Sequence, residues 1–339
     1  MAEFQLNQSN WTTAFMPPIW LSSTKGCDLA FNGIINPILC VLGFLTSLLT
    51  IFGLRRVPEK DNGTIWLLKT LALLDNIYIL LVLVFTSIST ITGHTGWISE
   101  TLTMYTRIIL QPLVLFAHSL ITWVLVLVTV DRYLAVCKPM DIKWRDLRRV
   151  KAAVKWMVVL AAVLHAPCFC EEALKSYHRV RCIDANNTVH NTCLTIGHLS
   201  NALWIFNRVS YSVFTSFVPL IILMILNVRI ASVLRALMKK RRQMSRQINS
   251  ERSLTKTLVA VVAVFVVCQM PERAFHIIHI AGVVADDELF CAMGITHALN
   301  NLNSSLNFII YYLSNRRLKR IFRGMLPCHP RQRTVVLVV

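Results

Sequence analysis

The sequence predicts an all-α membrane protein: a seven-transmembrane helix bundle with an amphipathic eighth helix on the cytoplasmic surface. The 339-residue chain is 55% hydrophobic and only 15% charged, which is less charge than soluble proteins usually carry. Apolar stretches long enough to span a bilayer as helices, about 20 residues each, recur along the whole chain. The short connections between these stretches favour one bundle over a string of domains.

The predicted transmembrane segments follow one another from residue 29 to residue 315. Five contain no Asp, Glu, Lys or Arg: 29–54, 76–99, 108–130, 209–228 and 289–315. The other two are 151–170, which begins with two lysines, and 257–284, which contains Glu272 and Arg273. The predicted organisation is therefore an N-terminal segment over 1–29, the bundle over 30–314, the amphipathic helix over 315–326 and a tail over 327–339.

The distribution of basic residues predicts the orientation in the membrane. The net charge is +18, and most of the 35 Lys and Arg residues lie in alternate connections and after the seventh segment. The positive-inside rule places these connections in the cytoplasm, so the N-terminus is extracellular and the C-terminus cytoplasmic. This arrangement argues against nucleic acid as a partner. Glycosylation sequons lie on the predicted outer side at Asn7, Asn10 and Asn186.

Four cysteines also fall on the predicted outer side, where an oxidising environment favours disulfides. Cys182 and Cys193 share one loop, and a bond between them would close a hairpin. A bond between Cys27 and Cys291 would tie the N-terminal segment to the last outer loop. The spacing alone leaves the other pairings, and free thiols, open.

Polar residues inside predicted helices are costly in lipid and need a partner or a function. One carboxylate on the second segment and an amide-rich run, NNLNSSLN, on the seventh predict an internal polar site. Its expected members are Asp75, Asn303, Ser304 and Asn307, with water or a sodium ion as candidate occupants and no other cofactor. The alternative is that these groups hold the helices together through hydrogen bonds.

Residues 315–326 have apolar side chains at helical spacing on one face and Arg and Lys on the other. This pattern predicts a helix lying on the inner membrane surface, attracted to anionic lipids. Cys328 follows it closely, and palmitoylation and a free thiol are both compatible with that position.

Asp131 and Arg132 end the apolar third segment in DRYLAVCKP, which resembles the signature of rhodopsin-like (class A) G-protein-coupled receptors. Five further motifs resemble family motifs in the same order over roughly residues 30–326. CQxP together with NFxxY and LNV most resembles the FMRFamide-receptor-like neuropeptide branch and its orphan relatives. The five motifs are LALLD with Asp75, Trp156, Pro219, FVVCQMP with Phe265 and Pro271, and NFIIY with Asn307 and Tyr311.

The chain departs from the family pattern at several positions. The cysteine of helix three is replaced by Arg107, so the usual link to the second outer loop is absent, which favours the Cys182–Cys193 hairpin. The other departures are Thr46–Ser47 for the helix-one Gly-Asn pair, Asn227 for the helix-five tyrosine, Gln269 for the helix-six tryptophan and Phe308 for the helix-seven proline.

The resemblance implies a conformational switch at the cytoplasmic face. Arg132 would pair with Asp131 and with Glu251 at the foot of helix six, and Met140 would contact the G protein. A partly exposed pair contributes about 1 kcal/mol, which an agonist with a preference of about 100-fold for the open state overrides. The implied switch residues are Asp131, Arg132, Tyr133, Glu251, Phe265, Gln269, Pro271, Asn307 and Tyr311.

The ligand-binding residues are likewise implied by the resemblance. Val114 replaces the Asp of amine receptors and Asn301 replaces the retinal lysine of opsins, so neither ligand fits. Glu272 would pair with an arginine of a peptide ligand; an internal network with Arg273 or His297 is the alternative. The implied pocket comprises Gln111, Val114, Leu115, His118, Arg208, Tyr211, Gln269, Glu272, Arg273, His276, Met293, His297 and Asn301.

The expected function is that of a G-protein-coupled receptor that binds an extracellular neuropeptide. It would activate heterotrimeric G proteins by opening the cytoplasmic ends of helices three and six, with arrestin and membrane lipid as further partners. A small-molecule chemosensory or orphan receptor is the alternative. The sequence shows neither the inverted repeats of transporters nor a catalytic cluster, so we predict no enzyme, and His276 with His279 makes too weak a metal site.

Overall fold

The computed structural model describes residue 27 and residues 29–55, 63–95, 100–137, 146–178, 191–240, 246–280 and 286–314. The elements within these ranges are all helical, and the predicted fold class is confirmed. In chain order they are η2 (Leu29–Ile35) with α3 (Asn36–Arg55), α4 (Gly63–Thr95), α5 (Glu100–Cys137), α6 (Leu147–His178), α7 (Asn191–Ser210) with η5 (Tyr211–Phe217) and α8 (Val218–Lys240), α9 (Arg246–Ile280) and α10 (Asp286–Ser314).

The helices are longer than the charge-free stretches that predict them. Helix α4 begins at Gly63, so Lys69 and Asp75 lie inside it, and α5 continues past Asp131 and Arg132 to Cys137. Charged residues therefore do not end these helices, because a backbone in lipid satisfies its polar groups best by staying helical. The apolar stretch marks only the middle part of each helix.

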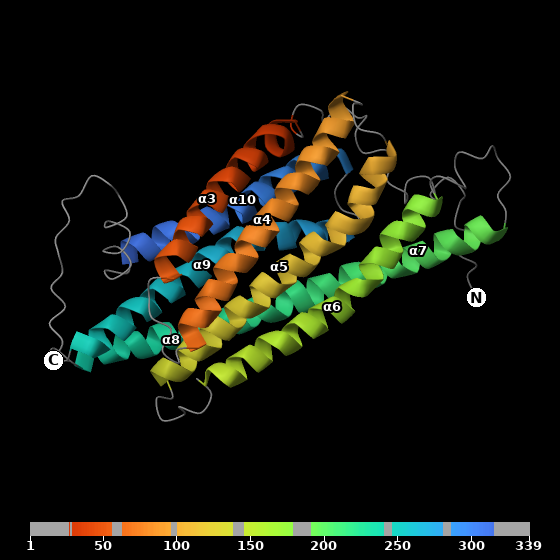
Figure 1. Cartoon of the computed structure of the whole chain (residues 1–339). Helices are drawn as coiled ribbons and strands as arrows, with labels where there is room; N and C mark the ends of the chain where they lie inside the picture. Colours follow the sequence, from red (N-terminus) through yellow and green to blue (C-terminus); the bar gives the residue numbers. More distant parts are fainter. Residues whose placement is uncertain are drawn as a thin grey trace.

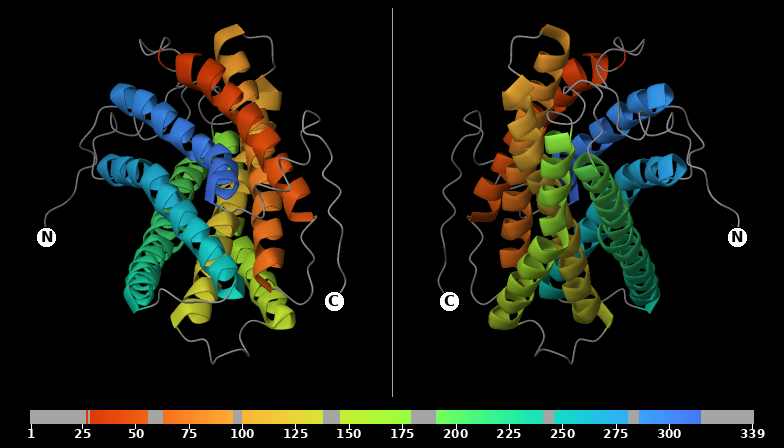
Figure 2. Two further views of the ribbon diagram at one scale, coloured as in Figure 1. Left: turned by 90° about the vertical axis from the view of Figure 1, so that its left-hand side faces the viewer. Right: turned by 90° about the vertical axis from the view of Figure 1, so that its right-hand side faces the viewer.

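The helices form one bundle with α5 at its centre (Figures 1 and 2). Helix α5 packs against α4, α6, α8 and α9, while α10 packs against α9 and α3. Helix α3 in turn packs against α4, which closes the arrangement. Helices α7, η5 and α8 continue one another, and the π-helical turn η5 directly precedes Pro219 on α8. Every polar group described below lies on a helix that contacts α5 or α10.

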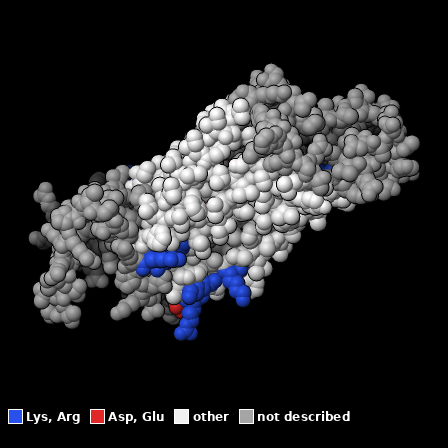
Figure 3. Space-filling model, turned by 45° about the horizontal axis from the view of Figure 1, so that its top comes forward, with Lys and Arg blue, Asp and Glu red and all other residues white. Residues whose placement is uncertain are grey.

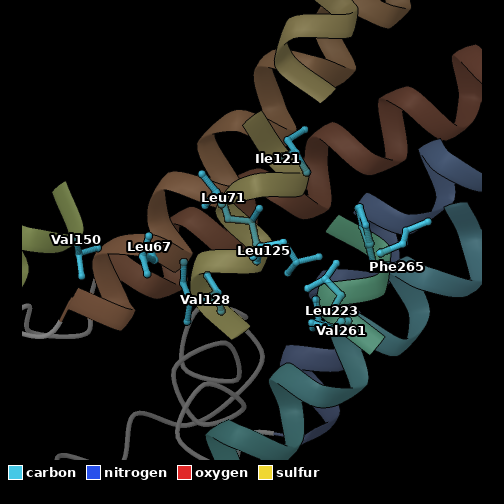
Figure 4. Packing of buried hydrophobic residues seen from close by; sticks show 14 of the residues in the cluster. Leu67, Leu71, Ile121, Leu125, Val128, Val150, Leu223, Val261 and Phe265 are labelled. Carbon is cyan, nitrogen blue, oxygen red and sulfur yellow. The ribbon is translucent and has the colours of Figure 1, made fainter. Parts of the chain in front are cut away.

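A buried apolar cluster packs side chains of α3, α4, α6, α8 and α9 around the C-terminal half of α5 (Figure 4). Helix α5 supplies residues at positions 121, 124, 125 and 128, which share one face because they are three or four residues apart. The labelled members in Figure 4 are Leu67, Leu71, Ile121, Leu125, Val128, Val150, Leu223, Val261 and Phe265. Packing at this cluster fixes α4, α6, α8 and α9 relative to α5.

The outward faces of the bundle carry large apolar side chains. Phe52, Trp156 and Val228 are each more than half exposed. By length and composition, five described helices qualify as membrane spans: Leu29–Arg55, Gly63–Ile88, Met104–Cys137, Leu147–Lys175 and Ala202–Ala236. Figure 3 shows Lys and Arg gathered at the end of the bundle where α6 begins, beside an uncharged face. The exposed basic residues at this end of α6 are Arg148, Arg149, Lys151 and Lys155.

Replacing a leucine at the centre of the apolar cluster is expected to weaken the whole bundle. Leu125 is 1% exposed, so Leu125→Ala leaves a cavity and lowers the free energy of unfolding by about 2–5 kcal/mol. Thermal unfolding of the purified protein in detergent measures the loss. Leu160→Ala on the outward face of α6, where the leucine is 55% exposed, is the matched control and should change little. Equal losses in the two variants would contradict this packing.

Candidate functional site

The first group of buried polar side chains surrounds Arg273 on α9. Its Nη2 donates to Gln269 Oε1 over 2.9 Å, one turn earlier on the same helix, and lies 2.8 Å from His118 Nε2 on α5. Because a guanidinium only donates, His118 Nε2 must accept, which places the imidazole proton on Nδ1. The guanidinium also lies over the Tyr211 ring, 5.1 Å from its centroid. Arg273 thus joins α5, η5 and α9.

Glu272 extends this group to α10. Asn300 Nδ2 donates to Glu272 Oε2, and Arg273 Nη2 lies 3.9 Å from the same oxygen. Glu272 therefore has partners inside the protein, as in the internal network that the sequence leaves open. Its pairing with an arginine of a ligand stays a prediction.

Aromatic rings enclose His118 on the side of α4 and η5. The Tyr78 ring centroid lies 5.5 Å and the Tyr211 centroid 6.4 Å from that of His118. We call Tyr78, His118, Tyr211, Gln269, Glu272, Arg273 and Asn300 the Arg273 network. Residues from α4, α5, η5, α9 and α10 meet in it, so a change in this network acts on five elements at once.

The structure brings five of the expected ligand-binding residues together: His118, Tyr211, Gln269, Glu272 and Arg273. Asn301 instead donates through Nδ2 to Asn36 Oδ1 on α3 over 3.1 Å and helps to hold α3 against α10. Val114 packs against a second apolar cluster of α3 and α4. Among the rest, Gln111, Leu115, Arg208 and His297 are half-buried, and the side chains of His276 and Met293 lie outside the described part.

A second group was missed by reading the sequence. Ser119 Oγ on α5 lies 2.7 Å from His165 Nε2 on α6 and 2.7 Å from Thr215 Oγ1 on η5. All three residues are buried. A single Ser, His or Thr on an apolar helix gives no signal of its own, because the match between helices depends on their relative rotation and height.

The third group lies at the end of α5 that the charge distribution assigns to the cytoplasm. Arg132 Nη2 lies 2.6 Å from Asp131 Oδ2 and donates to Thr64 Oγ1 at the start of α4, and the Thr64 hydroxyl donates to Asp131 Oδ2 over 2.5 Å. Arg132 is 3% and Asp131 6% exposed, so this pair is buried. Removing one partner would leave the other as an uncompensated buried charge, which lowers the free energy of unfolding by about 3–5 kcal/mol.

Several implied switch residues cannot be placed against this third group. The side chains of Glu251, Asn307 and Tyr311 and the whole of Met140 lie outside the described residues. Phe265 is a buried member of the apolar cluster. The Arg132–Glu251 pair therefore stays a prediction, while Thr64 is a partner of Arg132 that sequence reading did not find.

Asp75 lines a small pocket between α3, α4 and α10. The polar lining consists of Ser47, Thr50, Asp75 and Ser304. Asn76, which follows Asp75 in the chain, donates to Ser47 Oγ over 2.9 Å. Asn303, which precedes Ser304 on α10, is also buried. Carboxylate and hydroxyl oxygens suit a hard cation. Among the described residues, no group of three His, Cys, Asp or Glu side chains forms a metal site.

Covalent features on the predicted outer side are only partly visible. Cys27 is disulfide-bonded, but its partner is not among the described side chains. The described free cysteines are Cys40, Cys137, Cys168, Cys170 and Cys268. Other predicted features lie outside the described side chains and stay predictions: Asn7, Asn10, Asn186, Cys182, Cys193, Cys291, the helix over 315–326 and Cys328.

A helical bundle with apolar outward faces, a buried Asp-Arg pair at one end and a buried charged network in its interior is the architecture of a multi-pass membrane protein with an internal functional site. Residues 42–311 match the family described as "7 transmembrane receptor (rhodopsin family)", and the chain belongs to this family. The resemblance drawn from the motifs is thereby confirmed. The protein is a multi-pass plasma-membrane receptor and not an enzyme.

Relatives of known function include receptors for peptides. The chain is 25% identical to the FMRFamide receptor of Drosophila melanogaster over 299 residues, 86% of this chain and 52% of that receptor. It is 27% identical to the Homo sapiens somatostatin receptor type 3 over 340 residues, 94% of this chain and 75% of the receptor. The tachykinin-like peptides receptor 86C of Drosophila melanogaster is 23% identical, over 60% of this chain and 41% of that receptor. The chain thus spans about half the length of the FMRFamide receptor.

Removing the Ser119 hydroxyl is expected to loosen α6 and η5 from α5. Ser119→Ala leaves His165 Nε2 and Thr215 Oγ1 without this partner, so the free energy of unfolding should fall by about 1–3 kcal/mol. Thermal unfolding of the purified protein measures this loss of stability. Ser232→Ala is the control, because the exposed Ser232 hydroxyl donates within its own helix, to Val228 O. A Ser119 variant as stable as the control would contradict a role for this group in helix packing.

Proposed function

We propose that the protein is a receptor for an extracellular neuropeptide and activates heterotrimeric G proteins by opening the cytoplasmic ends of α5 and α9. The observation that carries this proposal is the buried Arg273 network, in which opposite charges from α9 meet polar side chains of α5 and α10. Buried charges inside a membrane bundle usually mark a functional site. The names of the relatives, which are receptors for FMRFamide, somatostatin and tachykinin-like peptides, support a peptide as the ligand.

The packing of α9 offers a route from this network to the cytoplasmic end. Gln269 lies one turn from Phe265, a member of the apolar cluster that fixes α9 against α5. Pro271 lies inside α9, where a proline removes one backbone hydrogen bond and lets the helix bend. A ligand that changes the contacts of Arg273 with Gln269 and His118 would therefore tilt the N-terminal half of α9, which precedes Pro271, and move it away from Arg132 on α5.

Further partners belong to the same proposal. With the basic residues at the start of α6 on the cytoplasmic side, the N-terminus is outside and the G protein binds near Arg132. Arrestin would bind the same open face, and anionic lipid would bind the basic residues that flank it. A sodium ion at Asp75, held by Ser47 and Ser304, would stabilise the closed state.

The direct test expresses the receptor in cells and screens a neuropeptide library, with G-protein activation as the readout. A peptide that activates the receptor, and not mock-transfected cells, is the expected result. Activation only by small non-peptide compounds would instead favour a chemosensory receptor and contradict the peptide part of the proposal.

Removing the Thr64 hydroxyl is expected to raise activity without any ligand. Thr64→Val takes away a hydrogen-bond partner from both Arg132 and Asp131, a loss of about 1.5 kcal/mol for the closed state, so basal G-protein activation should rise about tenfold. Thr70→Val is the control on the same helix, because the Thr70 hydroxyl bonds only its own helix, at Trp66 O. Unchanged basal activity in the Thr64 variant at equal surface expression would argue against this lock.

The sodium proposal predicts a salt-specific gain in stability. Sodium chloride should raise the unfolding temperature of the receptor above its value in N-methylglucamine chloride at the same ionic strength, because only sodium fits between oxygen ligands. Asp75→Asn removes the carboxylate and should abolish the difference, while Thr70→Val should keep it. A sodium effect that persists in the Asp75 variant would place the ion elsewhere.

A further inference from the structure

Three buried hydrogen-bonding atoms in the Arg273 network have no hydrogen-bond partner among the described residues. They are Nε and Nη1 of Arg273 and Oδ1 of Asn300. Arg273 is 4% and Asn300 5% exposed, so bulk water does not reach them readily. A buried polar atom without a partner lowers stability. A ligand that supplies the missing hydrogen bonds therefore gains binding free energy at this point.

The chemical character of these atoms is fixed by their neighbours. The Glu272 carboxylate only accepts hydrogen bonds, so the amino end of Asn300 must face it, and Oδ1 remains an acceptor. The Arg273 guanidinium only donates. Both residues meet at one atom, Glu272 Oε2, which accepts from Asn300 and lies 3.9 Å from Arg273 Nη2. The network thus offers donors and an acceptor close to each other.

The charges of the network exclude most other ligand groups. Arg273 and Glu272 balance each other, and His118 is a neutral acceptor toward Arg273. A ligand carboxylate would add a buried negative charge, and a ligand arginine or amine would add a buried positive one, both of which are costly in this environment. A carboxamide carries an accepting oxygen and donating N–H groups without charge.

We infer that the Arg273 network recognises an uncharged carboxamide of the ligand, with the carbonyl oxygen accepting from Arg273 and the N–H donating to Asn300 Oδ1. This inference rests on the proposed peptide ligand. Arg273 lies seven residues before the end of α9 at Ile280, which is about 10 Å along the helix. About three extended peptide residues cover that depth, so a peptide that enters from this end of α9 would be long enough to bring its C-terminal amide, or the side-chain amide of a Gln or Asn close to its end, to the network.

The main experiment compares peptides that differ only in the amide. For a peptide found in the screen, we expect the C-terminally amidated form to activate the wild-type receptor at least about tenfold more potently than the free acid. If the side-chain amide is the source, replacing that Gln by Glu gives the same loss. Arg273→Gln and Asn300→Leu should reduce either preference to about threefold or less. A preference that survives both substitutions, or no preference for any amide, overturns the inference.

Two further variants separate recognition from folding. Arg273→Lys keeps the positive charge but lacks the Nε and Nη1 donors, so it should fold and also lose the amide preference. Asn76→Ala is the matched control, because Asn76 is another buried asparagine with an unpaired Oδ1, but it bonds Ser47 and not the Arg273 network. Asn76→Ala should keep the preference, and its loss there would mean that any buried amide change has this effect.

A second readout needs no agonist. 3-Phenylpropanamide, 3-phenylpropanoic acid and 3-phenylpropylamine present an amide, a carboxylate and a cation on the same phenylpropyl frame, and only the first contains a carboxamide. At about tenfold excess over its Kd, only the amide should raise the unfolding temperature of the purified receptor, by about 2 °C or more, and Arg273→Gln should abolish the shift. Equal shifts with the acid or the amine, or none with the amide, overturn the inference. A shift with the amide but no peptide agonist in the screen would contradict the proposed peptide ligand and leave the amide site standing.

Discussion

Lipid offers no hydrogen bonds, and this constraint shapes every polar contact in the bundle. A backbone group or side chain in the hydrocarbon core must find its partner inside the protein or lose the free energy of solvation. The described chain meets the backbone requirement by remaining helical between its connections. It meets the side-chain requirement by placing polar residues where helices meet. Ser119 joins α5, α6 and η5, Arg273 joins α5, η5 and α9, and Arg132 joins α5 and α4.

The two buried arginines meet the same constraint to different degrees. Arg132 has a carboxylate beside it on the chain and a hydroxyl on α4, and both oxygens lie within hydrogen-bond distance. Arg273 has one carboxylate nearby, that of Glu272, whose Oε2 lies 3.9 Å from Arg273 Nη2 and is too far for a hydrogen bond. Its hydrogen bonds go to neutral groups, Gln269 and His118. The first arrangement suits a contact that holds two helices together. The second leaves bonding capacity for a group that arrives from outside, which is why the proposed ligand site lies at Arg273.

Reading the sequence predicted the architecture better than the contacts. Apolar length and the spread of basic residues are properties of each segment alone, so the helical bundle followed from them. The pairing of Asp131 with Arg132 followed from their adjacency in the chain and from the resemblance to the family signature. Thr64, His165 and Asn36 were not predicted as partners, because a contact between helices depends on how each is rotated and raised against its neighbour. The same limit explains Asn301, which the resemblance assigned to the pocket but which bonds Asn36 on α3.

The apolar cluster between the two polar ends gives the bundle its means of communication. His118 and Arg132 are fourteen residues apart on α5, about 20 Å at the rise of an α-helix, and the buried apolar side chains of the cluster fill much of the space between them. Closely packed side chains such as Leu125 and Phe265 deform little. In the proposed mechanism, a small rotation of α9 at the Arg273 network would therefore pass to the Arg132 end as a movement of whole helices, with the cluster as the pivot.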